Sequence, residues 1–144
     1  LDHKMMCLGE RRMELVALTE VLAESNGAAL AAALDATMAL SDVSDCQDAA
    51  QLLRDNERAS LDEPSPELIA VREEIAHGRS LANTRQLDEA LEVLSSARTR
   101  AHKLGHVRST VEATRWMGDV EQRRGNLDYA QELLEEATLT AEVE

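Results

Sequence analysis

A forty-residue internal repeat is the feature of this 144-residue sequence that most restricts its fold. Such a repeat indicates a supersecondary unit that packs against its own copy. Each copy is expected to be a helix, a tight turn and a second helix, with small residues where the two antiparallel helices approach closely. The recurring pairs, all at an offset of 40, are Gly78 with Gly118, Leu87 with Leu127, Ala90 with Ala130, Leu94 with Leu134, Ala97 with Ala137 and Ala101 with Ala141.

Composition agrees with an all-α fold of antiparallel helical hairpins stacked as a short solenoid. Apolar residues make up 44% of the chain, but it contains no Phe, one Trp and one Tyr. The core must therefore be built from Leu, Ala, Val and Met. Strands would need β-branched and aromatic residues alternating with period two, and no such run occurs.

Helical spacing and turn residues divide the chain into three parts. Residues 1–55 are predicted to form an N-terminal helical unit, with helices at about 2–24, 28–40 and 46–54. The polar stretch 56–65 is predicted to be a linker, and 66–144 the two repeats, with helices at about 66–84, 87–104, 106–124 and 127–143. The outward side of the last helix is expected to be either polar or covered by a further repeat. The expected N-terminal packing stripes are Leu8, Leu15, Leu18 and Leu22 in the first helix, widened by Met5, Met6 and Cys7, and Leu30, Leu34 and Met38 in the second.

The repeated part resembles the tetratricopeptide repeat family, in a form with a forty-residue period. Two departures stand out: Arg85 replaces a turn glycine and Glu121 an aromatic residue. If Arg85 takes the left-handed conformation of that glycine, its backbone is strained. The family's pattern is met by Gly118, Glu121, Gly125, Asn126, Leu127, Ala130 and Ala137, and less closely by Gly78, Leu81, Arg85, Gln86, Leu87, Ala90 and Ala97.

The N-terminal part is similar to the segment that joins the kinase to the repeats in large myxobacterial-type serine/threonine protein kinases. The similarity rests on the run 2–8, on 11–15 with Leu18, and on Cys46 after a second helix. It implies that the parent chain is a bacterial signalling kinase. The sequence itself has no Gly-rich phosphate loop, no His-Arg-Asp followed by Asn and no Asp-Phe-Gly, so it is not expected to be an enzyme.

Charge and cysteine content narrow the partners and the compartment. The net charge of -13 argues against nucleic acid, because phosphate binding needs a concentrated positive surface. No apolar run approaches the length of a membrane span, so no membrane partner is expected. Cys7 and Cys46 lie in different predicted helices and are interpreted as buried free thiols in a reducing cytoplasm.

No set of residues predicts catalytic, cofactor or metal chemistry. His102 and His106 are four apart, a spacing that can place two ligands on one helix face, but Gly105 should break the helix between them. We interpret this stretch as an exposed junction. His77, beside Gly78, is interpreted as a partly buried structural histidine rather than a general base.

The inner side of the predicted stack is the candidate binding surface. Arginines and the single tryptophan, which are frequent at binding hot spots, gather there. Two plainer readings stay open: Trp116 packs between repeats with Ala113 and Val120, and the arginines pair with local carboxylates. The expected function is a protein-protein interaction module that binds a protein or an acidic peptide, and the alternative is self-association, for example as a homodimer. Ile75 and Glu112 are further positions of this face, and the predicted protein-binding residues are Arg72, Arg79, Asn83, Arg115, Trp116, Asp119 and Arg123.

Overall fold

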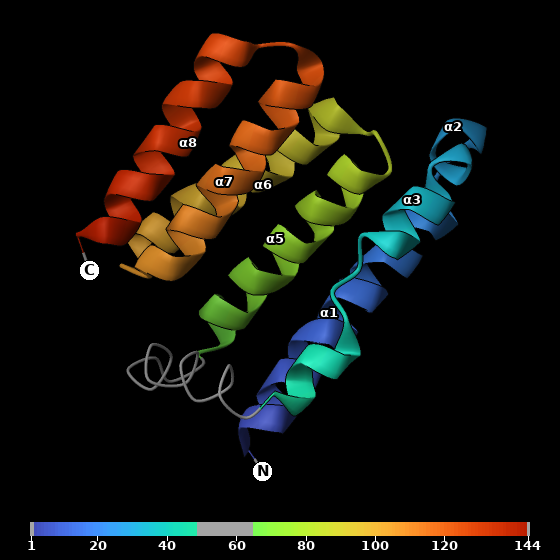
Figure 1. Cartoon of the computed structure of the whole chain (residues 1–144), viewed down its shortest axis with the longest axis horizontal. Coiled ribbons are helices and arrows are strands. Elements are labelled where there is room, and N and C mark those ends of the chain that lie inside the picture. The colour runs from blue at the N-terminus through green and yellow to red at the C-terminus, as the bar shows by residue number, and fades with distance from the viewer. Residues whose placement is uncertain (1, 49–64, 144) are drawn as a thin grey trace.

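The computed structural model describes residues 2–48 and 65–143, and in both ranges all regular structure is helical (Figure 1). The all-α prediction is therefore confirmed for the described residues, which contain no strand. The helices are α1 Asp2–Glu24, α2 Gly27–Ala31, α3 Ala33–Met38, the 3-10 helix η1 Val43–Gln47, α5 Pro66–Asn83, α6 Leu87–Lys103, α7 Val107–Arg124 and α8 Leu127–Glu142.

Helices α5 to α8 pack in chain order, each against the next, and α5 also contacts α7 (Figure 1). The first of them begins as its sequence predicts: the Ser65 hydroxyl accepts a hydrogen bond from the Leu68 amide at 3.1 Å, and Pro66 occupies the first turn. One continuous core includes Leu94 of α6 and Val120 of α7, both fully buried.

The three turns between these helices share one hydrogen-bond pattern. Each contains one residue in the left-handed region, at Arg85 (φ 64°), Gly105 (φ 67°) and Gly125 (φ 87°). In the first turn the amide of Gln86 donates to the Leu81 carbonyl at 2.9 Å. The amides of His106 and Asn126 close the other two turns in the same way, which satisfies carbonyls that a helix end leaves without partners.

The repeated glycines lie where the two helices of each hairpin approach most closely. A Cβ atom on Gly78 would lie 2.6 Å from Cγ of Leu94, and one on Gly118 would lie 2.8 Å from Cγ of Leu134. Neither distance is compatible with a real side chain. The glycine and leucine pairs therefore recur at an offset of 40 because both hairpins have the same close crossing.

Helix α1 packs along α5, and its buried face differs from the predicted one. Ala17, Leu18 and Val21 are buried, whereas Leu8 and Leu15 are exposed. Val21 belongs to the same core as α5 to α8. The predicted stripe counted leucines, but the contact with α5 is made over a narrower strip centred on Leu18.

The second predicted stripe is wrong. Leu30, Leu34 and Met38 are exposed, and three alanines on the other side, Ala29, Ala32 and Ala36, are buried instead. Methyl side chains allow this segment to lie close against its neighbours, which larger side chains would prevent. The helix predicted over 28–40 is also divided at Ala32 into α2 and α3.

The cysteine prediction is also wrong. Cys7 of α1 and Cys46 of η1 form a disulfide, with their Cα atoms 5.6 Å apart. The chain reverses through α2 and α3 and brings η1 back beside the start of α1, a proximity that the sequence does not reveal. Because disulfides persist mainly in oxidising compartments, the two cysteines do not support a reducing cytoplasm.

Other predictions concern residues at the edge of what the structure describes. The helix expected over 46–54 overlaps η1 only at 46–47, and Asp48, which should continue it, has an extended backbone. Residues 49–54 of that prediction, with most of the predicted linker, lie outside the described residues. Within the described ranges, no helix combines the length and apolar character that crossing a bilayer requires.

Candidate functional site

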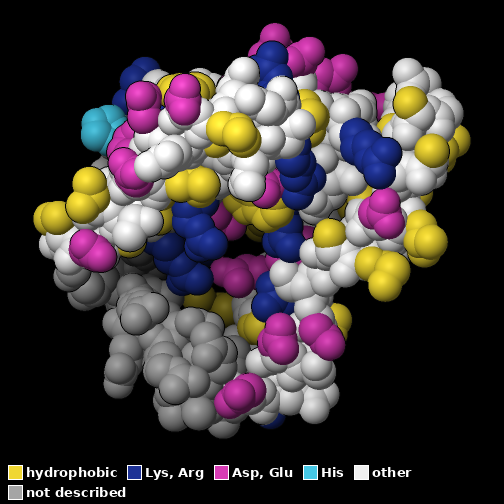
Figure 2. Space-filling view, turned by 45° about the horizontal axis from the view of Figure 1, so that its top comes forward, with side chains coloured by type: hydrophobic (Ala, Val, Ile, Leu, Met, Phe, Trp, Pro, Cys, Tyr) yellow, Lys and Arg dark blue, Asp and Glu magenta, His cyan; other side chains and the backbone are white. Residues whose placement is uncertain are grey.

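A cavity of about 610 Å³ lies between α1, α5 and α7, and we call it the arginine cavity. Figure 2 shows a hollow of this kind, where Lys and Arg side chains surround Asp and Glu side chains. In a protein of net charge -13 this is a local gathering of positive charge. Its charged lining consists of Arg11, Arg72, Arg79, Arg108 and Arg115 with Glu10, Glu14, Glu112 and Asp119.

Helix geometry explains why these side chains meet. Arg72 and Arg79 are seven residues apart on α5, and Arg108 and Arg115 are seven apart on α7. A spacing of seven is close to two helical turns, so each pair projects from one side of its helix. Because α5 and α7 contact each other, the two pairs border the same cavity.

Most of the residues predicted for the inner face line this cavity, and two do not. Asn83 and Arg123 lie outside its lining. Arg123 donates to the Ala82 carbonyl at 3.0 Å and to Asn83 Oδ1 at 3.4 Å, and it forms an ion pair with Asp119 at 2.8 Å. Arg123 therefore ties α7 to the end of α5. The predicted residues in the lining are Arg72, Arg79, Arg115, Trp116 and Asp119, with Ile75 and Glu112 beside them.

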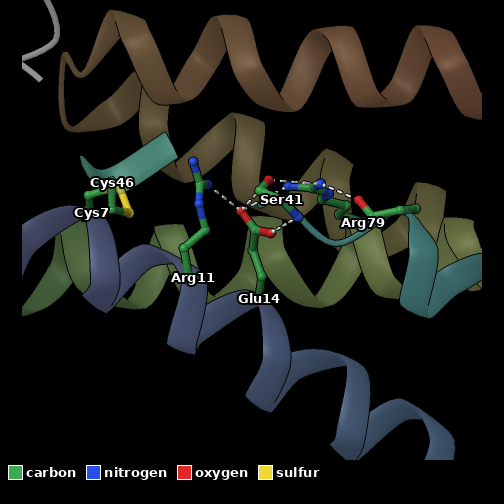
Figure 3. A network of polar contacts seen from close by, with 7 residues as sticks. Cys7, Arg11, Glu14, Ser41, Cys46 and Arg79 are labelled. Carbon is green, nitrogen blue, oxygen red and sulfur yellow. Dashed lines mark hydrogen bonds and ion pairs between the residues drawn. A yellow bond between two sulfur atoms is a disulfide. The ribbon is translucent and has the colours of Figure 1, made fainter. Parts of the chain in front are cut away.

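Glu14 of α1 is the centre of a polar network at the edge of the cavity (Figure 3). One of its oxygens, Oε1, lies 3.1 Å from a guanidinium nitrogen of Arg11 and 3.1 Å from one of Arg79. The Ser41 hydroxyl donates to the same oxygen at 3.0 Å, and the Ser41 amide donates to Oε2 at 3.1 Å. Sequence reasoning missed Glu14 and Ser41, since nothing local indicates that they meet across 27 residues.

Arg79 joins this network to the wall of the cavity. Its Nη2 donates to the Ala39 carbonyl at 3.0 Å, and its guanidinium lies 5.1 Å from the centre of the Trp116 ring. Trp116 itself is half-buried, packs against the core and also lines the cavity. Arg79 therefore holds the segment 39–41 and Trp116 in place.

Three arginines of the cavity differ from Arg79 in their ion pairing. Within the described residues, Arg72, Arg108 and Arg115 form no ion pair, in contrast to Arg79 and Arg123. Arg72 is half-buried, and Arg108 and Arg115 are exposed at the mouth. Their guanidinium groups are the part of the cavity best able to bind an added anion.

Glu112 lies among these arginines and remains accessible to solvent. Desolvation by the surrounding protein raises the pKa of Glu112, and the nearby charge of Glu10 acts in the same direction. The positive charges of Arg108, Arg79 and Arg72 oppose this shift. Glu112 consequently takes up a proton at a higher pH than an ordinary glutamate, and the cavity becomes more positive when it does.

Within the described ranges, no histidine is part of the cavity lining. His106, expected at an exposed junction, is buried and caps α7, with its Nδ1 accepting from the Ser109 amide at 3.2 Å. The Ser109 hydroxyl lies 2.8 Å from the same nitrogen, and Ser109, although buried, is one of the residues that line the cavity. Among the described residues no group of His, Cys, Asp and Glu is arranged to hold a metal ion.

The fold and the cavity define an all-α protein with a polar, arginine-lined pocket. Comparison with protein-family models, with curated proteins and with solved structures finds no match to this chain.

Proposed function

We propose that this chain is a non-enzymatic interaction module whose arginine cavity binds an acidic peptide or a free C-terminal carboxylate. The observation that carries the proposal is the group formed by Arg72, Arg108 and Arg115, which line one cavity without ion pairs among the described residues. Guanidinium groups bind carboxylates through two parallel hydrogen bonds, and each sheltered contact contributes roughly 1.5 to 3 kcal/mol.

The acidic surface outside the cavity supports the same ligand class. A net charge of -13 repels an acidic peptide from most of the molecule, so binding would be favoured at the arginine cavity. Because these contacts are electrostatic and partly exposed to solvent, they should weaken as the salt concentration rises.

We further propose that the module is the regulatory or recruiting region of a larger serine/threonine protein kinase. Support for this comes from the sequence alone, through the N-terminal run 2–8, the segment 11–15 and Cys46. The resemblance to tetratricopeptide repeats at Gly118, Gly125 and their neighbours supports the role of an interaction module in the same way.

A charge-matched pair of variants tests the cavity. The probe is a fluorescein-labelled tetraglutamate peptide with a free C-terminus, followed by fluorescence anisotropy, with tetraglutamine amide as the uncharged reference. We expect micromolar affinity for the wild type and a loss of about tenfold or more for Arg72→Ala with Arg115→Ala. Lys4→Ala with Lys103→Ala removes the same charge at exposed sites outside the cavity and should change affinity by less than about twofold. Equal losses in both variants would mean that only overall charge matters.

Self-association is a second candidate, favoured by a separate observation. Leu30, Leu34 and Met38 form an exposed apolar stripe along α2 and α3. Such stripes on a protein surface often mark contacts with another chain. If this stripe mediates assembly, light scattering of the wild type will give a mass above that of one chain, and Leu34→Glu with Met38→Glu will restore the monomer mass. A monomeric wild type at high concentration excludes this candidate.

A further inference from the structure

The outward side of α8 carries an apolar groove of about 610 Å³, which adjoins the arginine cavity at Gln122 and Leu134. We call it the α8 groove. Leu127 and Leu139 are its most exposed apolar residues, at 62% and 63%. The remaining lining is Gln122, Ala130, Gln131, Leu134, Glu135, Thr138 and Glu142.

The equivalent surface of the first hairpin, on α6, is covered by another helix. Leu94 of α6 and Leu134 of α8 are the same position of the repeat, and each packs against the glycine of its hairpin. Yet Leu94 is 0% exposed and Leu134 is 36% exposed. Helix α7 packs against α6, whereas within the described residues no helix covers the corresponding side of α8. The part of the groove at Ala130 and Leu134 is therefore equivalent to the buried surface at Ala90 and Leu94 one repeat earlier, whereas Leu139 stands where the first hairpin has the exposed Thr99.

The occupant of the equivalent surface is an α-helix with a defined apolar spacing. Helix α7 contributes Ala113, Met117 and Val120 to the core that contains Leu94. These positions follow the spacing i, i+4 and i+7, which forms a single stripe on a helix. A helix with small and medium apolar side chains at this spacing fits the α8 groove by the same contacts.

The negative charge of α8 determines which helices of this kind can bind. Helix α8 carries five carboxylates, on Asp128, Glu132, Glu135, Glu136 and Glu142, and contains no Lys or Arg. Glu135 and Glu142 border the groove itself. A partner with Lys or Arg beside its apolar stripe would be attracted, whereas a second α8, equally acidic, would be repelled from this groove.

We infer that the α8 groove is a docking site for a basic amphipathic helix of a partner protein. The apolar stripe of that helix lies over Leu127, Leu134 and Leu139, and its basic side chains pair with the carboxylates at the rim. The groove adjoins the arginine cavity and shares Gln122 and Leu134 with it, but Leu127, Leu139 and the carboxylates of the groove are not part of the cavity lining. Its occupation by a basic helix does not depend on acidic-peptide binding.

The test uses a synthetic helical peptide of 18 residues, the length of α7. It carries Ala, Met and Val at i, i+4 and i+7 and lysine on its other faces, and a second peptide has glutamate in place of every lysine. Fluorescence anisotropy should show micromolar binding of the basic peptide to the wild-type chain and none of the acidic peptide.

Two double variants separate the groove from general attraction to an acidic protein. Leu127→Glu with Leu139→Glu and Tyr129→Glu with Val143→Glu each replace two exposed apolar residues near or on α8 by carboxylates, but only the first pair lines the groove. The first should weaken basic-peptide binding about tenfold or more, and the second should leave it equal or slightly stronger. Circular dichroism confirms that both variants fold.

Three outcomes overturn the proposal. They are equal affinity of all three proteins for the basic peptide, absence of binding to the wild type, and a wild-type dimer that the groove variant alone dissociates. The last result would assign the groove to a second copy of the chain. Failure of tetraglutamate to bind would concern the arginine cavity only.

Discussion

Arg85 holds a backbone conformation that glycine adopts in the equivalent turn. Its φ of 64° matches the left-handed region of Gly125, and its amide makes the same type of bond, to the Ala82 carbonyl at 3.1 Å. A side chain in this region contacts its own backbone and raises the energy of the folded state. The ion pair of Arg85 with Asp35, at 3.6 Å, gives little in return because both side chains are exposed.

Arg85→Gly should therefore stabilise the protein. We expect a gain of about 1 kcal/mol, which corresponds to a melting temperature roughly 2–4 °C higher for a domain of this size. Thermal unfolding followed by circular dichroism measures the change. A lower melting temperature would show that Arg85 contributes more through its side chain than its backbone costs.

Two helical glycines should respond to alanine with opposite signs. Gly78→Ala would place a methyl against Leu94, which is fully buried, and should destabilise the fold by about 1–3 kcal/mol. Gly9 of α1 has no neighbouring atom within 4 Å of a Cβ, so Gly9→Ala should instead add about 0.5–1 kcal/mol through helix propensity. Urea unfolding of both variants tests this, and a change of the same sign in both would contradict the close-crossing explanation.

At the scale of elements, helix periodicity was informative for α5 to α8 and misleading for the N-terminal segment. Each repeat has a glycine inside its first helix, and each helix from α5 to α7 is followed by a turn residue. These signals are local in sequence, and the structure has helices and turns at the positions that they indicate. The burial of Ala29 in place of Leu30, and the meeting of Glu14 with Ser41, depend on how α2, α3 and η1 fold back along α1. That return path is not encoded in any local spacing, so no sequence pattern could predict it.

The disulfide between α1 and η1 should be visible in the thiol count. We expect no free thiol in the purified protein, native or denatured, and two after reduction. Cys7→Ser with Cys46→Ser should lower the free energy of unfolding by about 2–4 kcal/mol, because the crosslink restricts the unfolded chain. Titration with a thiol reagent and urea unfolding measure both effects. Two reactive thiols in the denatured, unreduced protein would restore the free-cysteine interpretation.

At the scale of the whole molecule, the arginine cavity places opposite charges from three helices in one space. Sequence spacing could predict that Arg72 and Arg79 share a side of one helix and Arg115 and Asp119 a side of another. Sequence spacing could not predict that Glu14 would form an ion pair with Arg79, because α1 reaches the cavity only in the folded chain. Tertiary contacts, rather than the repeat pattern, therefore determine which arginines of the cavity are already in ion pairs and which can bind a ligand.

Glu112 should make binding of an acidic peptide dependent on pH. Its pKa is raised by desolvation from the surrounding protein and by Glu10, and lowered by the facing Arg108, Arg79 and Arg72, with a net upward shift. As the pH falls, Glu112 becomes neutral and its repulsion of a carboxylate ligand disappears, while tetraglutamate stays largely ionised down to about pH 5. Affinity for tetraglutamate should therefore rise as the pH falls from neutrality.

Glu112→Gln is the control for this prediction. It should bind tetraglutamate about fivefold more tightly at neutral pH, the effect of removing roughly 1 kcal/mol of like-charge repulsion, and its affinity should change less with pH than that of the wild type. Anisotropy titrations at several pH values make the comparison. A pH dependence that survives unchanged in Glu112→Gln would assign it to another group.

The crosslink between Cys7 and Cys46 also decides how the chain carries mechanical load. Tension applied between the two ends passes directly from one sulfur to the other, so the 39-residue separation between them cannot lengthen while the bond is intact. A fully extended segment of that size spans about 130 Å, a length that becomes available under load only when the bond is reduced and the helices of this segment unfold. In a protein stretched between two attachment points, the segment between Cys7 and Cys46 is therefore inextensible in its oxidised form, whereas in its reduced form it can unfold into a long tether.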